Sequence, residues 1–168
     1  REAGAGGKWL PQNPAFDRRF RERFLDLHLA AARGACARWT ESADGALALM
    51  ILLDQYPRNA FRGTAHMYAT DGLCRSYARE AEWRGHMAKV EPELRLFLAL
   101  PFAHSEDMAD QEMSIVLNGR LGEPSLSHAE GHRDIIRRFG RFPHRNAILG
   151  RVTRPEEEAF LRDGGFSG

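Results

Sequence analysis

Apolar side chains recur at helical spacing near the start of the chain. The steps are three and four residues, as on one face of an α-helix, and the residues are Phe16, Phe20, Phe24 and Leu27. Asn13 followed by Pro14 is a common helix start, because proline fits the first helical position. The pattern predicts an amphipathic helix that runs from Pro14 towards Gly34.

Residues 43–55 are apolar on nearly every side. Ser42 precedes this segment as a helix cap, and the segment has no continuous polar face. We expect it to be the central helix of the fold, and we expect Pro57 to end it. Asp54 lies on the same face as apolar residues, so it is predicted to be at least partly buried, where a carboxylate needs a partner.

The same signals predict five more helices. They run from Thr70 or Asp71 to Arg84, from Pro92 to Leu100, from Ser105 to about Asn118, from Ser125 to Phe139, and from a capping box at residues 153–156 to Arg162. No segment shows the alternation of a strand with turn signals at both ends. The chain is therefore predicted to be all-α, either a bundle or stacked antiparallel helical hairpins, in one domain over residues 1–168. Residues 1–8 are expected to be disordered.

Charge is distributed unevenly along the chain. The formal net charge of +1 argues against general attraction to nucleic acid or to an anionic membrane. Residues 132–154 nevertheless contain seven arginines and Asp134 as their single acid. A guanidinium offers a planar set of donors that matches carboxylate or phosphate. This segment is therefore expected to face either acids of the protein itself or an anionic ligand.

The cysteines and the absence of long apolar runs predict a compartment. Cys36 and Cys74 lack metal-ligand spacing and lie in segments with helical patterns, so buried free thiols and a reducing environment are expected. No apolar run has the length of a membrane span, and residues 1–7 lack the apolar core of a signal peptide. We therefore expect a cytoplasmic protein without a membrane partner. The chain begins with Arg1 rather than Met, so a natural start further upstream is allowed for.

Two short segments of similar sequence carry an arginine and an asparagine. Residues 56–60 read Tyr-Pro-Arg-Asn-Ala, and residues 142–147 read Phe-Pro-His-Arg-Asn-Ala. Each is predicted to follow a helix, where arginine and asparagine can cap the last carbonyl groups. Internal duplication is the other interpretation. In both cases we expect two loops of similar chemistry at the same end of the helical array.

Histidines and acids near these arginines are candidates for acid–base chemistry. His144 lies in a predicted loop, and His104 and Asp107 share one face of the helix predicted after residue 104. The structural interpretation is that Glu106, Asp107 and Asp110 are solvated acids of a first helical turn, where the helix dipole favours them. His132 lies on an apolar helix face and is expected to be a core histidine.

Three longer segments resemble a known family. They are residues 52–59 with 61–64, residues 100–107 with 110–112, and residues 132–151. Together they resemble a bacterial family catalogued as domain of unknown function 924, and Trp9, residues 69–71 and residues 155–157 also match its pattern. The resemblance covers nearly the whole chain and implies an all-helical, tetratricopeptide-like fold, but it implies no reaction. The apolar-aromatic helix that precedes the tryptophan in this family is absent here.

The leading hypothesis is a pocket for a small anionic ligand. The expected ligand-binding residues are Asp54, Arg58, Arg62, Asp107, Asp110, Arg141, Arg145 and Asn146, and the catalytic candidates are His104, His144 and Asp107. The question of an enzyme stays open, because no nucleophile–base pair or phosphate-binding loop has a diagnostic spacing. No cofactor and no metal site are predicted, and the oligomeric state is not indicated.

Two other hypotheses compete with this pocket. A tetratricopeptide-like module could grip a peptide or protein on its concave face, and the arginines could all be satisfied by acids of the same chain. Nucleic-acid binding ranks behind these, because Phe139 and Phe142 are better placed for packing than for stacking on bases.

Overall fold

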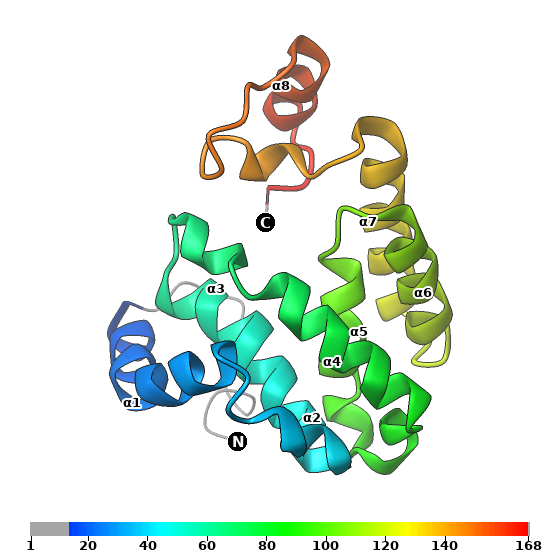
Figure 1. Cartoon of the computed structure of the whole chain (residues 1–168). Coiled ribbons are helices and arrows are strands. Elements are labelled where there is room, and N and C mark those ends of the chain that lie inside the picture. The colour runs from blue at the N-terminus through cyan, green and yellow to red at the C-terminus, as the bar shows by residue number, and fades with distance from the viewer. Residues whose placement is uncertain (1–13, 168) are drawn as a thin grey trace. The chain divides into compact units, whose positions relative to one another are not determined.

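The computed structural model describes residues 14–167, with side chains from residue 18 onward, and every regular element in this range is helical (Figure 1). The predicted all-α class is therefore confirmed. The chain divides after Pro101 into two compact units, called here the N-terminal unit and the C-terminal unit. Each unit is described by itself. None of the described helices combines the length and apolar character needed to cross a bilayer.

The N-terminal unit is built around one long central helix. Its helices are α1 (Pro14–Ala32), α2 (Ala43–Met50), α3 (Tyr56–Ala60) and α4 (Asp71–Trp83), and α5 (Leu96–Ala103) crosses into the C-terminal unit. A π-helical turn, Ile51–Gln55, joins α2 to α3 without a break. Helix α1 packs against α3, and α2 packs against α4. Residues Ala46, Leu49, Met50, Leu53 and Tyr56 of the central helix are 0% exposed, as its apolar sequence predicts.

Pro57 does not end the central helix, contrary to the prediction, because two hydrogen bonds accommodate the proline within the helix. The N–H of Tyr56 donates to the carbonyl of Ile51, five residues back, so the helix is widened before the proline. The carbonyl of Leu53, four residues before Pro57, accepts a hydrogen bond from Thr70 Oγ1 at 2.6 Å. The helix therefore continues to Ala60.

The helix predicted over residues 92–100 is displaced along the chain. A 3₁₀ turn occupies Pro92–Leu94, and α5 follows with Pro101 inside its last turn. The residues of α5 are almost all apolar, and Leu98, Ala99, Phe102 and Ala103 are buried. Burial of this segment outweighs the local preference of proline for the start of a helix.

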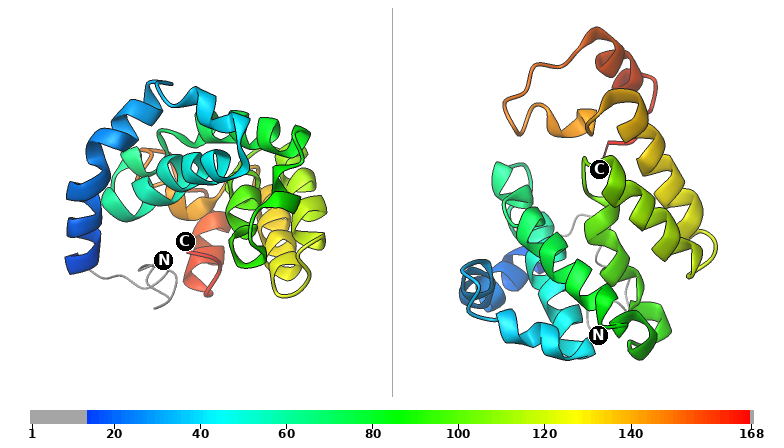
Figure 2. Two further views of the ribbon diagram at one scale, coloured as in Figure 1. Left: turned by 90° about the horizontal axis from the view of Figure 1, so that it is seen from below. Right: turned by 45° about the vertical axis from the view of Figure 1, so that its right-hand side comes forward.

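The C-terminal unit contains a helical hairpin. Helices α6 (Met108–Gly119) and α7 (Ser125–Phe139) lie side by side and are joined by a short turn (Figure 2). Helix α7 has the predicted bounds. After it the chain forms a 3₁₀ turn, Pro143–Arg145, and ends with α8 (Pro155–Arg162). A tetratricopeptide-like stacking of such hairpins along the chain stays a prediction.

The polar face of α6 points inward. Gln111, Ser114 and Asn118 are buried, whereas Val116 is 52% exposed. Gln111 Nε2 donates to the carbonyl group of Ala103, the last residue of α5, at 3.0 Å. It also donates to the carbonyl group of Ser105, just after the helix, at 2.6 Å. This face therefore satisfies backbone groups that a helix end leaves without partners.

Candidate functional site

The predicted site residues fall into both units. Asp54, Arg58 and Arg62 belong to the N-terminal unit, and the remaining candidates belong to the C-terminal unit. The two similar segments differ in conformation, because residues 56–60 lie inside a helix and residues 143–145 form a 3₁₀ turn. The prediction that each is a loop after a helix is therefore wrong for the first segment.

Arg58 joins two buried carboxylates in the N-terminal unit. Its Nη1 lies 3.0 Å from Asp54 Oδ1 and 2.9 Å from Asp71 Oδ1, and its Nη2 lies 2.9 Å from Asp71 Oδ2. Asp54 is 1% exposed and Asp71 is 7% exposed. Burial alone would lower the pKa of Arg58, but Asp54 and Asp71 raise it above its ordinary value. The predicted burial and pairing of Asp54 are confirmed, with Arg58 as its partner.

Arg62 lies in the same part of the chain as Arg58 but contacts a different residue. Arg62 Nη2 donates to Asn59 Oδ1 at 2.5 Å, so its guanidinium contacts the segment that precedes it. Asp71 was missed as a partner because it begins α4, where an acid is expected for the helix dipole alone. This group is a buried ion network, and its contacts are those of a structural element.

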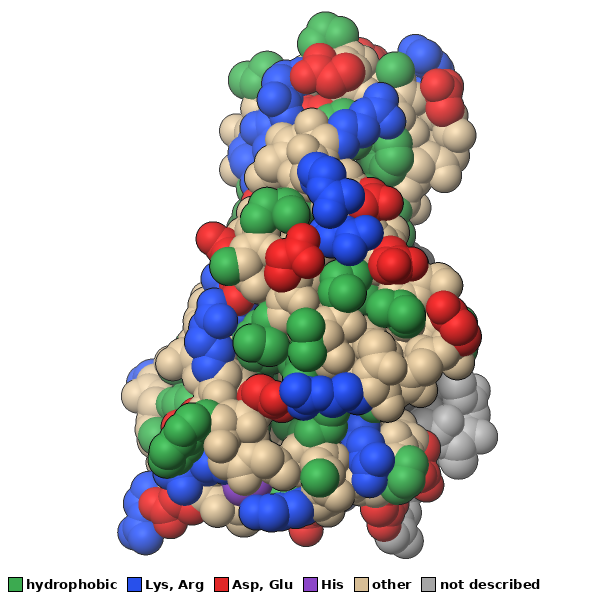
Figure 3. Space-filling view, turned by 90° about the vertical axis from the view of Figure 1, so that its right-hand side faces the viewer, with side chains coloured by type: hydrophobic (Ala, Val, Ile, Leu, Met, Phe, Trp, Pro, Cys, Tyr) green, Lys and Arg blue, Asp and Glu red, His purple; other side chains and the backbone are tan. Residues whose placement is uncertain are grey.

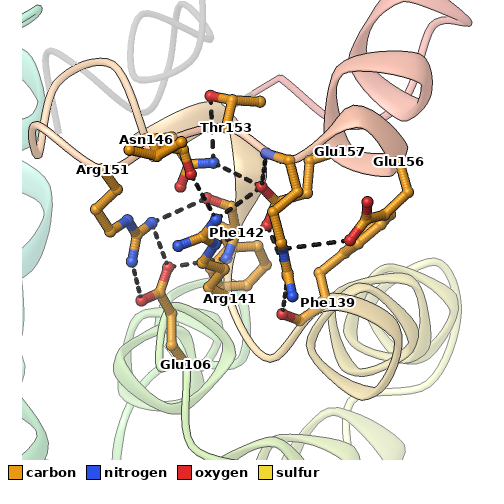
Figure 4. A network of polar contacts seen from close by, with 11 residues as sticks. Glu106, Phe139, Arg141, Phe142, Asn146, Arg151, Thr153, Glu156 and Glu157 are labelled. Atoms are coloured by element: carbon orange, nitrogen blue, oxygen red, sulfur yellow. Dashed lines mark hydrogen bonds and ion pairs between the residues drawn. The ribbon is translucent and has the colours of Figure 1, made fainter.

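Glu157 is the centre of a second network, in the C-terminal unit (Figure 4). Its side chain is fully buried and accepts hydrogen bonds from Arg141 Nε at 2.6 Å and Nη2 at 2.8 Å. Asn146 Nδ2 donates to it at 3.1 Å, and the backbone N–H and Nη2 of Arg154 each donate at 2.8 Å. The hydrogen bonds from Arg141 lower the pKa of Glu157 far below its usual range, against the effect of burial.

Glu157 also explains a shift in a predicted motif. The capping box was expected at residues 153–156, but the structure has Arg154 at the N-cap and Glu157 at the third helical position. Glu157 lies one residue further along than the expected Glu156, and this places its carboxylate among the arginines. The hydrogen bond from the Arg154 N–H, which forms the cap, is one of several that Glu157 accepts.

Glu106 binds a further arginine from the same segment. Arg151 donates to it through Nη1 at 2.7 Å and Nη2 at 3.0 Å, and the N–H of Phe142 donates at 2.8 Å (Figure 4). Burial would raise the pKa of Glu106, but these hydrogen bonds lower it below its ordinary value. Arg141 and Arg151 are therefore held by acids of the chain, which supports the structural interpretation for these two residues.

The two predicted acids at the start of α6 have local partners. Asp107 is the N-cap, and its Oδ1 accepts hydrogen bonds from the N–H groups of Ala109 at 2.8 Å and Asp110 at 3.2 Å. Asp110 is 2% exposed, and its Oδ2 accepts from Ser105 Oγ at 2.6 Å. The helix therefore begins at Met108 rather than Ser105, because Asp107 caps it.

Three histidines and an arginine come together around Phe142. We call His104, His132, His144 and Arg145 the histidine–arginine cluster. Arg145 is 7% exposed, its Nη2 donates to the carbonyl of His104 at 2.9 Å, and its guanidinium lies 4.5 Å from the centre of the Phe142 ring. The rings of His132 and His144 lie 5.5 and 5.6 Å from that of Phe142, and the rings of His104 and His132 are 6.4 Å apart.

Two of these imidazoles are held neutral. Burial is the largest cause of the low pKa of His132, which is about 3, and the neighbouring His104 and the positive charge of Arg145 lower it further. The pKa of His144 is about 4, again through burial first and Arg145 second. The Nδ1 atoms of His132 and His144 are buried and make no hydrogen bond in the described structure. His132 was predicted to be a core histidine, and its apolar face gave no sign of the other histidines around it.

Metal binding is not indicated by the arrangement of ligands. Within residues 18–167, no three His, Cys, Asp or Glu side chains are grouped so that they could hold an ion. Cys36 and Cys74 are buried free thiols, as predicted.

Neutral histidines in the cluster make stability sensitive to acid. In the unfolded chain these imidazoles have the ordinary pKa of about 6.5. Below that pH the unfolded chain therefore binds protons that the folded chain does not bind. At pH 5.5 we expect His132 and His144 each to lower the free energy of unfolding by roughly 1–2 kcal/mol, and the loss to grow as the pH falls towards 4.

Urea denaturation between pH 8 and pH 5 measures this change in the free energy of unfolding. The variant His132→Gln should flatten the pH dependence, whereas His128→Gln, whose histidine is exposed in the same helix, should not. Equal stability of the parent protein at pH 8 and pH 5.5 would show that these imidazoles are protonated in the folded state.

Comparisons with known proteins identify relatives of unknown function. A family model described as bacterial protein of unknown function (DUF924) matches residues 2–165. The chain is similar to a solved structure of a protein of unknown function, ATU0120, from Agrobacterium tumefaciens. The two sequences are 56% identical, the match covers 97% of this chain and 92% of that chain, and the TM-score is 0.93. No match was found among curated proteins.

Proposed function

The chain belongs to the DUF924 family of bacterial proteins, and we propose that it binds a small anionic ligand at the histidine–arginine cluster. The supporting observation is the surroundings of His132 and His144. Both imidazoles are largely buried, and their Nδ1 atoms make no hydrogen bond. Arg145 and Arg151 act on His144 as positive charges, and Glu106 acts on it as a negative charge.

An anion would relieve this imbalance. It would accept hydrogen bonds from imidazole N–H groups and interact with the guanidinium of Arg145, which is charged at every physiological pH. Binding would also favour the protonated imidazoles, so that a proton is taken up with the ligand. Of the residues expected from sequence, this proposal retains Arg145, His104 and His144 as direct participants.

The other arginines have a supporting place in the proposal. Arg141 and Arg151 are bonded to Glu157 and Glu106, and these contacts position residues 142–146. Catalysis is not part of the proposal, because Asp107 is engaged as a helix cap.

The face of the molecule shown in Figure 3 does not favour the peptide-binding alternative. On the face shown in Figure 3, acidic and basic side chains are interspersed, and the hydrophobic side chains form small separate groups. Peptide grooves of helical-repeat proteins are continuous surfaces formed by successive repeats. On this face the charges are mixed, and Arg141, Arg151 and Arg137 are paired to acids, which argues against a basic stripe of the kind that binds nucleic acid.

The proposal is tested by following the histidine ring signals by NMR while inorganic phosphate is added at constant ionic strength. The signals of His132 and His144 should move, and their pKa values should rise towards 6.5, while the signal of His86 in the N-terminal unit stays unchanged. The variant Arg145→Lys should weaken phosphate binding by about tenfold or more, because it loses the planar set of donors. Equal movement of all histidine signals, or none at millimolar phosphate, would refute the proposal.

A further inference from the structure

The ring of Phe166 packs against two histidines of the histidine–arginine cluster. The Phe166 ring meets those of His132 at 4.7 Å and His144 at 5.1 Å, both edge to face, and lies 6.3 Å from the ring of Phe142. Phe166 is nevertheless 42% exposed. The ring of Phe166 therefore packs against two imidazoles of the cluster and against Phe142 while a large part of its surface faces solvent.

The backbone before Phe166 is shaped to bring it there. Gly164 has φ +84°, a left-handed conformation that other residues adopt at a cost. A Cβ on Gly165 would lie 2.5 Å from the ring of Phe160, so a side chain does not fit without displacing that ring. These two glycines turn the chain after α8 and direct Phe166 towards the cluster.

The packing of Phe166 shows what the cluster accepts. Edge-to-face contacts with imidazole and phenyl rings favour an aromatic group over an aliphatic one of similar size. The guanidinium of Arg145 lies over the ring of Phe142, and the ring of Phe166 lies 6.3 Å from that same ring, so Phe142 is a neighbour of both. Phe166 is 42% exposed, so its departure uncovers less apolar surface than the loss of a fully buried ring, and it can act as an exchangeable occupant.

We infer that the ligand of this cluster is an anion that bears an aromatic ring, such as an aryl phosphate or an aromatic carboxylate, and that this ring exchanges places with Phe166. The inference rests on the proposed function. It adds the chemical class of the ligand and makes Phe166 an internal competitor for its ring. Removal of the competitor should therefore strengthen binding of a ring-bearing anion, because the binding-competent state is then fully populated.

The test compares phenyl phosphate with inorganic phosphate by titration calorimetry on the full chain. The parent protein should bind phenyl phosphate more tightly than inorganic phosphate. Phe166→Ala should tighten phenyl phosphate by about tenfold and leave inorganic phosphate unchanged. Val152→Ala removes an apolar side chain of the same unit that is 85% exposed, and it should change neither affinity. If Phe166→Ala unfolds, Phe166→Leu keeps an apolar side chain there and should show the same selective effect to a smaller degree.

The outcomes separate the two proposals. Phosphate binding with no preference for phenyl phosphate, or equal tightening of both ligands in Phe166→Ala, would overturn the inference and leave the anion site standing. Failure of both ligands to bind to the parent and the variants would overturn the proposed function itself.

Discussion

Replacing Glu157 by glutamine is expected to destabilise the C-terminal unit by about 3 kcal/mol. The carboxylate is fully buried and accepts hydrogen bonds from Arg141, Arg154 and Asn146. Glutamine keeps the size but replaces one acceptor oxygen by a donor, which then faces donors of the arginines. For a chain of this length the loss corresponds to a fall of roughly 10 °C in Tm.

Circular dichroism during heating measures this loss, and Glu158→Gln is the matched control. Glu158 is the next residue of α8 and is exposed, so its charge contributes through the helix dipole alone, and its replacement should cost less than about 1 kcal/mol. Similar melting temperatures for both variants would show that the network around Glu157 is not a source of stability.

Local signals in the sequence are sufficient for much of the helical framework. Three helices are predicted by signals that span only a few residues, namely Asn13-Pro14, Ser42 and the apolar spacing of residues 125–139. The structure has the corresponding helices over Pro14–Ala32, Ala43–Met50 and Ser125–Phe139. The cap at Ser42 forms as expected, with Gly45 N–H donating to its Oγ at 3.1 Å. Asn13 lies outside the described residues, as do residues 1–8.

Two errors in the helices have different causes, one tertiary and one local. Pro57 is tolerated because Thr70, thirteen residues away, takes over a carbonyl group that the proline cannot reach. The helix after residue 104 begins late because Ser105 bonds Asp110 and Asp107 becomes the cap. The bond from Thr70 could not be inferred from local preference, whereas Asp107 is a preferred N-cap residue, and Ser105 was only the earlier of two possible helix starts.

The arginine-rich segment shows how a sequence can mark a site without revealing its contacts. Seven arginines among residues 132–154 predict a concentration of donors, but their partners lie elsewhere. Arg151 pairs with Glu106, 45 residues earlier, and Arg141 pairs with Glu157, 16 residues later. The sequence therefore locates the excess of positive charge correctly. The expectation that Arg141 faces a ligand did not account for Glu157, an acid of α8 that binds this arginine.

Replacement of Arg58 by methionine is expected to cost about 3–5 kcal/mol, the largest effect of any single change proposed for this chain. Methionine retains a long apolar side chain, so the change removes the guanidinium with little change in volume. Asp54 and Asp71 would then remain buried without the charge that Arg58 places between them. Burial of carboxylates without a matching charge is among the most costly defects in a folded protein.

Arg38→Met is the control for this prediction. Arg38 also pairs with a carboxylate, Glu41 at 3.2 Å, but its side chain is 89% exposed, so its loss should cost less than about 1 kcal/mol. Urea denaturation of both variants gives the comparison. In the double variant Arg58→Met with Asp71→Asn, the loss should be smaller than the sum of the two single losses, because they belong to one network. If Arg58 instead serves a ligand, the Arg58→Met variant should unfold at the same urea concentration as the parent. That result would show that the buried ion network does not stabilise the fold.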